Sequence, residues 1–392
     1  MKRFKHVIIG GGMTAASAAV GIREAGDQGS VALFGDEGHP PYDRPPLSKA
    51  LWKGAPLESI WRKTADLGIE LQVGRAIVKL DAVSRTVTDQ AGAQFGYDKL
   101  LLATGGTPRR LPFAAPGVIY YRTVDDYQRL REAARAGAHV AVIGGGFIGS
   151  EIAAALAMNQ VRVTLLFPDA GIGARIYPAA LAAFLGTYYQ EKGVSVLAGE
   201  LVNAVERAGT QTLIKTASGR AISADAVVAG IGLQPRTELA RAAGLQLDNG
   251  VCVDPYLCTS NPDIYAAGDV ANFFAPVLDA RMRVEHEDNA NTMGKVAGGN
   301  MAGRAVRYDH LPSFYSDLFD LGYEAVGELD ARLELVEDWK EPFRKGVIYY
   351  LREGQVRGVL LWNTWNRVDA ARELIAAKQT LSPADLIGRI SD

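Results

Sequence analysis

Cysteine is scarce in this chain. Its 392 residues include Cys252 and Cys258 alone, too few for a disulfide framework and too far apart for a CxxC redox pair, so we interpret both as structural. Long apolar runs are also missing, because the best stretch, residues 143–156, is interrupted by Glu151 and falls short of the ~18 residues that a membrane span needs. No His, Cys or Asp cluster has metal-site spacing, and no Ser or Cys nucleophile lies in an elbow motif. The sequence therefore predicts no membrane span and no metal.

An excess of charge of one sign is absent as well. Lys and Arg total 42 and Asp and Glu total 44, for a formal charge of -2, which disfavours binding to nucleic acid or to an anionic membrane. The first residues run directly into the apolar segment 7–9, without a separate apolar segment of a signal peptide. We therefore expect a cytoplasmic globular protein with two or three domains.

Glycine is abundant, and it gathers in short clusters behind apolar segments. The 43 glycines are about 11% of the chain, against an average of about 7%. The first cluster follows residues 7–9 and has the pattern GxGxxA, with Gly10, Gly12, Thr14 and Ala15 as candidate cofactor-binding residues. Gly10 allows a tight turn, Gly12 lets the backbone approach a pyrophosphate, and Ala15 lets the helix pack on the strand. Asp36, at the end of the next strand, is expected to bind a ribose hydroxyl.

The same arrangement recurs after an apolar segment at residues 139–143. A GxGxxG turn opens a helix, a strand follows, and a carboxylate comes 20 residues after the last glycine. The helix N-terminus would offer free N–H groups to phosphates. Two complete motifs predict two dinucleotides, FAD and NADH, between which a hydride passes. The candidate residues on the nicotinamide side of this motif are Gly144, Gly146, Phe147, Ile148, Gly149, Glu151 and Asp169.

Three further segments fit an FAD site in the first motif. Two of them resemble each other, each being an apolar strand end followed by glycine and proline, and both are expected to be crossovers between domains. The third is a strand at residues 264–266 that ends in Gly-Asp, suited to direct Asp269 at a ribityl hydroxyl. The candidate residues in these segments are Ala103, Thr104, Gly105 and Arg109 in the first, Gly232 in the second, and Gly268 and Asp269 in the third.

With these motifs together, the chain resembles the two-dinucleotide-binding-domain flavoproteins, and among them the apoptosis-inducing-factor group and the FAD-dependent ferredoxin and rubredoxin reductases. The resemblance implies an α/β fold with two Rossmann-like domains, similar to glutathione reductase, and a C-terminal α+β domain with an antiparallel sheet. One departure is Tyr315, where the family usually has Trp. The resemblance rests on residues 41–49, 103–109, 144–151, 283–286, 314–317 and 345–352.

The order of the motifs predicts the domain boundaries. Residues 1–113 and 243–310 are expected to form the FAD domain, residues 114–242 the NAD(H) domain, and residues 311–392 the C-terminal domain. The last part predicts an antiparallel sheet with a covering helix. Its expected strands are residues 323–329, 332–337, 345–351 and 356–362, and its expected helix is residues 368–378.

Lys49 and Glu151 are the main candidates for chemistry. The resemblance places both beside the flavin N5, where a partly desolvated ion pair can stabilise the charge of reduced flavin. The alternatives are a solvated loop end for Lys49 and simple complementation of the helix dipole for Glu151.

Other candidates surround a helix expected at residues 288–301. Its N-terminus is expected to face the flavin C2 carbonyl, and Glu285 and His286 precede it. His286 either contacts the nicotinamide or caps this helix. Phe314 and Tyr315 either shield the flavin or belong to the core. Arg44 and Arg109 each follow a strand end and suit phosphate or flavin-edge contacts.

The acceptor of the electrons is left open by the sequence. The leading prediction is an NADH-dependent FAD oxidoreductase that reduces a ferredoxin- or rubredoxin-type protein or a quinone. The alternative is a slow NADH-binding redox sensor like apoptosis-inducing factor, with a stable reduced complex as its output. Disulfide, peroxide and coenzyme-A-disulfide reductases need a cysteine near the flavin, typically in the loop after the first ribose-binding strand. In this chain that loop has Ser48-Lys49 and no cysteine, so the sequence excludes these three activities. The protein is expected to be a monomer or a homodimer.

Overall fold

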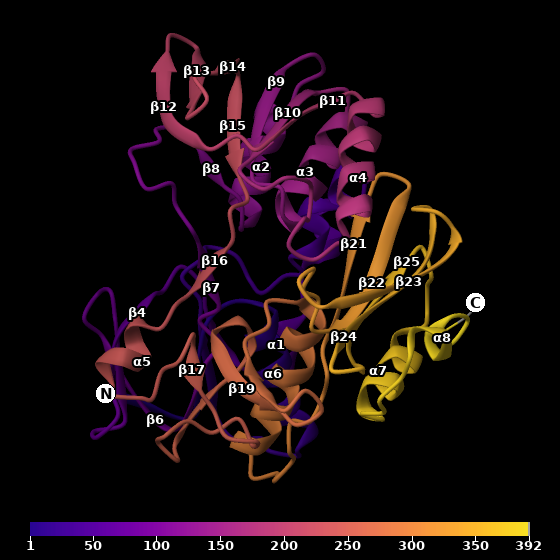
Figure 1. The fold of residues 1–392 in the computed structure, drawn as a ribbon. Coiled ribbons are helices and arrows are strands. Elements are labelled where there is room, and N and C mark those ends of the chain that lie inside the picture. The colour runs from indigo at the N-terminus through magenta and orange to yellow at the C-terminus, as the bar shows by residue number, and fades with distance from the viewer. Residues whose placement is uncertain (391–392) are drawn as a thin grey trace. The chain divides into compact units, whose positions relative to one another are not determined.

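The computed structural model describes residues 1–390, and these form two compact units (Figure 1). The first unit contains residues 1–44, 57–107 and 234–312. The second contains residues 45–56, 108–233 and those from 313 onward. The chain passes between the units after Thr107 and after Leu233, within the two segments that the sequence predicted as crossovers. The predicted division into three domains stays a prediction.

The first unit is built on a sheet whose central strands are parallel. Its order is β3-β2-β1-β6-β5-β4, and β18 also pairs with β6. Strand β2 and the C-terminal ends of β1 and β6 are buried, and β18 is mostly buried, as expected for parallel strands covered on both faces. The strands of this sheet are β1 (Lys2–Ile9), β2 (Val31–Phe34), β3 (Glu70–Gln72), β4 (Ile77–Asp81), β5 (Thr86–Asp89), β6 (Gln94–Leu102) and β18 (Ile264–Ala266).

Helices α1 (Met13–Glu24) and α6 (Glu287–Met301) lie side by side in this unit (Figure 1). Small residues bring the backbones together: a Cβ atom added at Gly294 would lie 2.4 Å from the Thr14 carbonyl oxygen, and one at Gly298 would lie 2.0 Å from that of Ala18. The predicted helix at residues 288–301 is confirmed, one residue longer. The unit also contains α5 (Glu238–Ala242), β17 (Val251–Cys252), β19 (Ala271–Ala275), β20 (Ala280–Met282) and the short 3-10 helices Leu57–Ile60, Thr64–Leu67 and Gly268–Val270.

The second unit contains a parallel sheet of five strands in the order β11-β10-β9-β15-β8. Three helices accompany it, and a small antiparallel sheet, β12-β13-β14, follows in the chain. The elements are β8 (Ile119–Tyr120), α2 (Val124–Ala133), β9 (His139–Ile143), α3 (Phe147–Met158), β10 (Arg162–Phe167), α4 (Ala179–Glu191), β11 (Val194–Ala198), β12 (Val202–Ala208), β13 (Gln211–Thr216), β14 (Ala221–Ala224) and β15 (Ala226–Ala229). At the crossovers lie β7 (Gly106–Pro108) and β16 (Leu233–Pro235), and two 3-10 helices, Pro45–Ser48 and Ala50–Lys53, flank Lys49.

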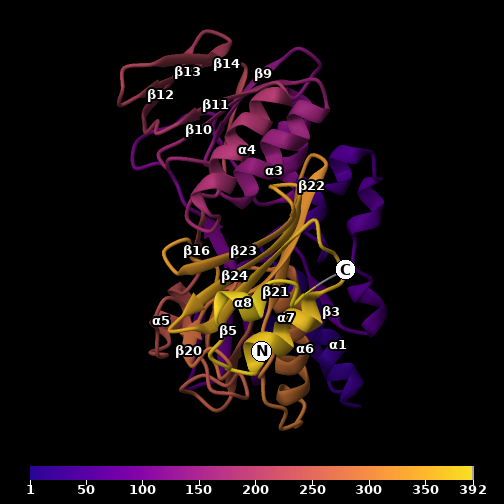
Figure 2. The same cartoon turned by 45° about the vertical axis from the view of Figure 1, so that its right-hand side comes forward.

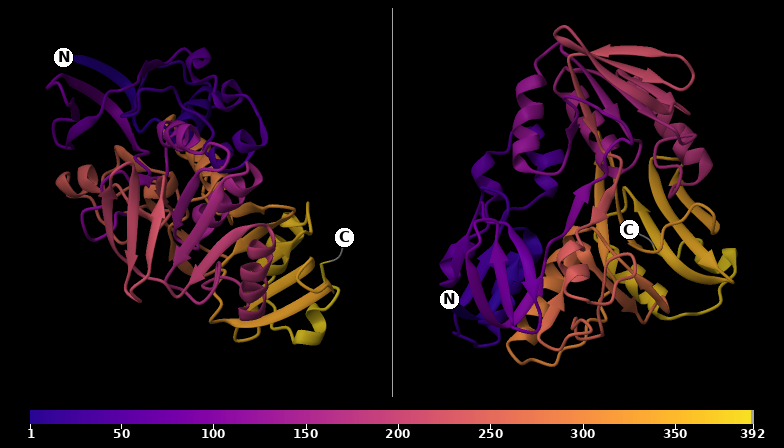
Figure 3. Two further views of the ribbon diagram at one scale, coloured as in Figure 1. Left: turned by 90° about the horizontal axis from the view of Figure 1, so that it is seen from above. Right: turned by 90° about the vertical axis from the view of Figure 1, so that its left-hand side faces the viewer.

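The C-terminal part of the second unit is an antiparallel sheet in the order β21-β22-β25-β24-β23, seen in orange and yellow in Figure 3. Helices α7 and α8 lie beside it (Figure 2). The predicted fold class is confirmed, and so are the four expected strands and the helix. The first strand, β21, was not predicted. The bounds are β21 (Ser313–Leu318), β22 (Leu321–Gly327), β23 (Glu334–Glu341), β24 (Lys345–Arg352), β25 (Gln355–Trp362), α7 (Val368–Ala376) and α8 (Pro383–Leu386).

Among residues 1–390, no helix combines the length and the apolar character needed to cross a membrane.

Candidate functional site

The first glycine-rich turn connects β1 to α1 as the sequence predicted. Gly10 has φ +133°, and a Cβ atom there would lie 2.0 Å from the Ala103 carbonyl oxygen, so glycine is required. Gly12 is the N-cap residue of α1, and no side chain caps the helix there. A Cβ atom on Gly12 would meet Arg44 Nη2 alone, at 4.0 Å. Free N–H groups facing open space at a helix N-terminus fit a bound pyrophosphate.

The Gly-Asp element lies against the same helix. Gly268 has φ +75°, and a Cβ atom added there would lie only 2.2 Å from Thr14 Oγ1. The absence of a side chain at Gly268 therefore leaves room for Thr14. Asp269 follows it and is buried. Ala15 is fully buried in the first turn of α1, as close helix packing requires. The structure thus brings Thr14 and Gly268 together, which agrees with a single cradle for the FAD pyrophosphate.

Two carboxylates follow β2, where the sequence singled out one. Asp36 pairs with Arg236 Nη1 at 2.6 Å. Glu37 binds Tyr42 and the half-buried Arg44. Burial opposes the charge of Arg44, but Tyr42 and Glu37 outweigh it and raise the pKa of the guanidinium. Glu37 is a second candidate for the ribose, and its place directly after Asp36 could have indicated it.

The two crossover segments are joined to each other by hydrogen bonds. Thr104 Oγ1 donates to the Arg236 carbonyl oxygen at 2.8 Å, and the Gly105 carbonyl oxygen accepts from Arg236 N at 3.0 Å. In the second unit, Arg109 N donates to the Gly232 carbonyl oxygen at 2.9 Å, and Gly232 has φ +96°. Arg109 and Gly232, predicted for opposite cofactors, are therefore neighbours.

The segment before α6 holds the predicted Glu285 and His286. Arg283 pairs with Glu285 and also donates to the Asp269 carbonyl oxygen at 3.1 Å, which ties this segment to the Gly-Asp element. His286 is the N-cap residue of α6, but its side chain makes no cap hydrogen bond. The alternative that His286 caps this helix is confirmed for its position, without a side-chain cap hydrogen bond, while its contact with nicotinamide stays a prediction.

The second glycine-rich turn repeats the geometry of the first. Gly144 has φ +118°, and a Cβ atom there would lie 2.4 Å from the Gly230 carbonyl oxygen. A Cβ atom on Gly149 would lie 1.8 Å from the Gly144 carbonyl oxygen. Gly146 is the uncapped N-cap of α3, with nothing within 4 Å of an added Cβ atom. The turn fits the pyrophosphate of a second dinucleotide.

Three predicted residues lie around this second turn. Phe147 and Ile148 form the first turn of α3, and Ile148 is exposed. Asp169 follows β10, and its Oδ1 accepts from Nε and Nη2 of Arg175, both at 3.2 Å. Asp169 can thus receive a ribose hydroxyl bond, with a guanidinium beside it.

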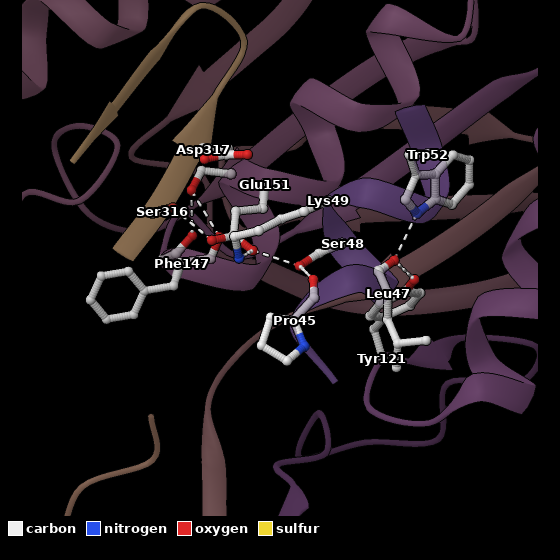
Figure 4. Close-up of polar contacts among 12 residues, drawn as sticks. Pro45, Leu47, Ser48, Lys49, Trp52, Tyr121, Phe147, Glu151, Ser316 and Asp317 are labelled. Atoms are coloured by element: carbon white, nitrogen blue, oxygen red, sulfur yellow. Dashed lines mark hydrogen bonds and ion pairs between the residues drawn. The ribbon is translucent and has the colours of Figure 1, made fainter. Parts of the chain in front are cut away.

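Glu151 lies in α3 as a buried carboxylate, 3% exposed, and the structure brings Lys49 to it (Figure 4). Lys49 Nζ lies 2.7 Å from Glu151 Oε2. Ser48 Oγ donates to the same oxygen at 2.6 Å, and Ser316 Oγ donates to Oε1 at 2.6 Å. The sequence did not indicate either serine as part of the site, because no motif marks them as partners of Glu151. The alternative of a solvated loop end for Lys49 is wrong, since its side chain is 11% exposed.

The aromatic candidates on β21 have different surroundings. Phe314 makes an edge contact with Phe147, with ring centroids 5.3 Å apart. Tyr315 is 41% exposed, and Lys49 Nζ lies 5.1 Å from its ring centroid. Contact of either ring with a cofactor stays a prediction.

A wall of buried aromatic rings lies near Glu151. The Tyr177 ring makes edge contacts with Tyr323 and Trp362, each at 5.8 Å between centroids. Burial raises the pKa of the Tyr177 and Tyr323 phenols well above their usual value, so these groups are neutral at physiological pH. A neutral wall that excludes water strengthens the interactions of the Glu151 carboxylate.

No group of three or more His, Cys, Asp or Glu side chains that could hold a metal occurs within residues 1–390. Cys252 and Cys258 are free thiols, and burial raises the pKa of Cys258.

Two nucleotide turns on two sheets with parallel central strands, with a buried ion pair beside one of them, define an oxidoreductase that uses FAD and NAD(H). The chain belongs to the pyridine nucleotide-disulphide oxidoreductase family, whose model matches residues 4–294. A second model, the C-terminal domain of mitochondrion-associated apoptosis-inducing factor, matches residues 334–377. The predicted resemblance is confirmed.

Relatives of known name cover nearly the whole chain. Apoptosis-inducing factor 1, mitochondrial, of Dictyostelium discoideum is 33% identical over 97% of this chain and 80% of its own length. Putidaredoxin reductase CamA of Pseudomonas putida is 33% identical over 97% of this chain and 94% of its own length. A solved covalent complex of putidaredoxin reductase with putidaredoxin matches with a TM-score of 0.91 and 32% identity, over 98% of this chain and 95% of that chain.

Proposed function

We propose that the chain carries electrons from NADH, through FAD, to a small iron–sulfur or rubredoxin-type protein, or to a quinone. The observation that carries this proposal is the likeness, over nearly the whole chain, to a putidaredoxin reductase that forms a complex with putidaredoxin. The loop that holds Ser48 and Lys49 has no cysteine, which argues against reduction of a disulfide despite the name of the family.

The residues have distinct proposed roles. The uncapped start of α1 after Gly12 holds the FAD pyrophosphate, and Asp36 or Glu37 holds its ribose. The start of α3 after Gly146 holds the NADH pyrophosphate, and Asp169 holds its ribose. When bound, FAD accepts a hydride and can release electrons one at a time.

Lys49 is proposed to stabilise negative charge on the reduced flavin, as the resemblance implies. Glu151 holds the ammonium in place, since the two groups are 2.7 Å apart in a buried place. The resemblance also leads us to propose cofactor contacts for four further residues, Glu285, His286, Phe314 and Tyr315.

A second function has its own support. The match to the C-terminal domain of apoptosis-inducing factor favours a redox sensor with slow turnover, whose output is the reduced complex with NAD⁺. In that case the electron acceptor would be secondary.

Stopped-flow spectroscopy separates the two functions. The enzyme is reduced with NADH without oxygen and is then mixed with air, putidaredoxin or a soluble quinone. Fast reoxidation by putidaredoxin or the quinone supports the reductase. A long-lived charge-transfer band that no acceptor removes supports the sensor and refutes the reductase.

A cytoplasmic location and a monomeric or homodimeric state stay predictions. Cell fractionation and sedimentation analysis test them.

A further inference from the structure

Glu151 has more hydrogen-bonding capacity than its ion pair uses. Lys49 binds Oε2, the oxygen that also accepts from Ser48. A buried carboxylate needs donors on both oxygens, because each unpaired oxygen costs free energy away from water. The donor to the opposite oxygen, Oε1, is Ser316 at 2.6 Å.

Ser316 comes from β21, a strand 165 residues further along the chain than Glu151. The strand is fixed on both sides of Ser316. Phe314 packs against Phe147 at the first turn of α3, and Asp317 pairs with Lys53 at 2.9 Å. Ser316 itself is 1% exposed and aligns with Tyr323 of β22. Its hydroxyl is therefore held at one place, beside Glu151 Oε1 (Figure 4).

We propose that Ser316 is a positioning residue for Lys49, acting through Glu151. By donating to Oε1 it stops the carboxylate from rotating, so that Oε2 stays 2.7 Å from Lys49 Nζ. The ammonium is then kept at one place between the carboxylate and the Tyr315 ring, whose centroid lies 5.1 Å away. This inference rests on the proposed charge-stabilising role of Lys49.

The two serines are not equivalent in this arrangement. Ser48 shares Oε2 with Lys49, so its removal leaves that oxygen held by the ammonium. Removal of Ser316 takes a donor from Oε1 and frees the carboxylate to turn. We therefore expect Ser316 to matter more than Ser48 for the position of the Lys49 ammonium.

A double-mutant cycle on the FAD-loaded full chain tests the inference. The midpoint potential of the flavin is measured by redox titration for Ser316→Ala, Lys49→Met and the double variant. We expect Ser316→Ala to lower the potential, in the same direction as Lys49→Met but by less. We expect no further shift when Ser316→Ala is added to Lys49→Met, because no ammonium is left to position.

Matched variants separate positioning from general packing. Ser316→Thr keeps the hydroxyl and should restore the wild-type potential. Ser316→Cys keeps the size with a weak donor and should give a smaller decrease than Ser316→Ala, which covers the case that the alanine variant fails to fold. Ser313→Ala, in the same strand but in contact with Arg372, should leave the potential unchanged.

The outcomes are distinguishable. If Lys49→Met shifts the potential but Ser316→Ala does not, or if the two shifts add, the inference is refuted and the role of Lys49 stands. If Lys49→Met leaves the potential unchanged, the proposed role of Lys49 fails, and the inference fails with it.

Discussion

Replacement of Lys49 by Met is the most direct test of the ion pair. The side chain of Lys49 is 11% exposed and that of Glu151 is 3% exposed, with 2.7 Å between Nζ and Oε2. Met fills similar space but removes the positive charge. The buried carboxylate would then keep its two serine donors and lose its counter-charge.

Two magnitudes follow from this geometry. Removing one partner of a buried ion pair lowers the free energy of unfolding by about 3–5 kcal/mol. Here we expect about 3 kcal/mol, because the Ser48 and Ser316 hydroxyls still donate to the Glu151 carboxylate. One lost charged interaction of ~1.5–3 kcal/mol with the reduced flavin corresponds to a potential lower by ~30–65 mV for a two-electron couple. The variant should therefore be both less stable and harder to reduce.

The assay combines urea unfolding with redox titration of the FAD-loaded protein. Lys49→Met/Glu151→Gln, which removes both charges, should recover most of the lost free energy of unfolding but not the potential. Glu151→Gln alone should raise the potential or change it little, since Lys49 remains. FAD content should be unchanged in all three variants.

A wild-type potential and hydride-transfer rate in Lys49→Met would refute the reasoning about the flavin. An unfolding free energy equal to that of the wild type would refute the reasoning about the buried pair.

Three further predictions test the nucleotide sites. Gly12→Val should fold, because its Cβ atom meets no backbone. It should nevertheless purify colourless and bind no added FAD, since the valine side chain fills the space of the pyrophosphate. A yellow protein would contradict this prediction. Gly149→Ala should lower the free energy of unfolding by about 1–3 kcal/mol, because the new Cβ atom would lie 1.8 Å from the Gly144 carbonyl oxygen. Gly146→Ala should keep the wild-type stability but weaken NADH binding, as measured by calorimetry. Equal stability of the two variants would count against this packing. NADH should give a higher kcat/KM than NADPH. Asp169→Ala should narrow this difference between the two donors, because it frees Arg175 to bind a 2′-phosphate. Comparable kcat/KM values for NADH and NADPH in the wild type would rule out Asp169 as the residue that selects NADH.

The nucleotide turns could be predicted from the sequence because they are local. Each is a strand, a turn and a helix in continuous chain, and Gly10 and Gly144 both adopt the positive φ angles that glycine favours. The same holds for α6, whose small residues repeat at helical spacing. The fold class follows, since two such units with an antiparallel sheet after them leave few alternatives.

The tertiary structure alone decided which distant side chains meet. The bonds between Ser316 and Glu151, between Asp36 and Arg236, and between Arg109 and Gly232 join residues far apart in the chain, and no spacing in the sequence records them. Strand β21 also escaped prediction. Its polar and aromatic residues do not alternate as in a half-buried strand, because Ser316 is buried by its bond to a carboxylate and Tyr315 remains exposed. Local backbone preferences set the turns, whereas long-range packing and the need to satisfy a buried charge set the ion-pair site.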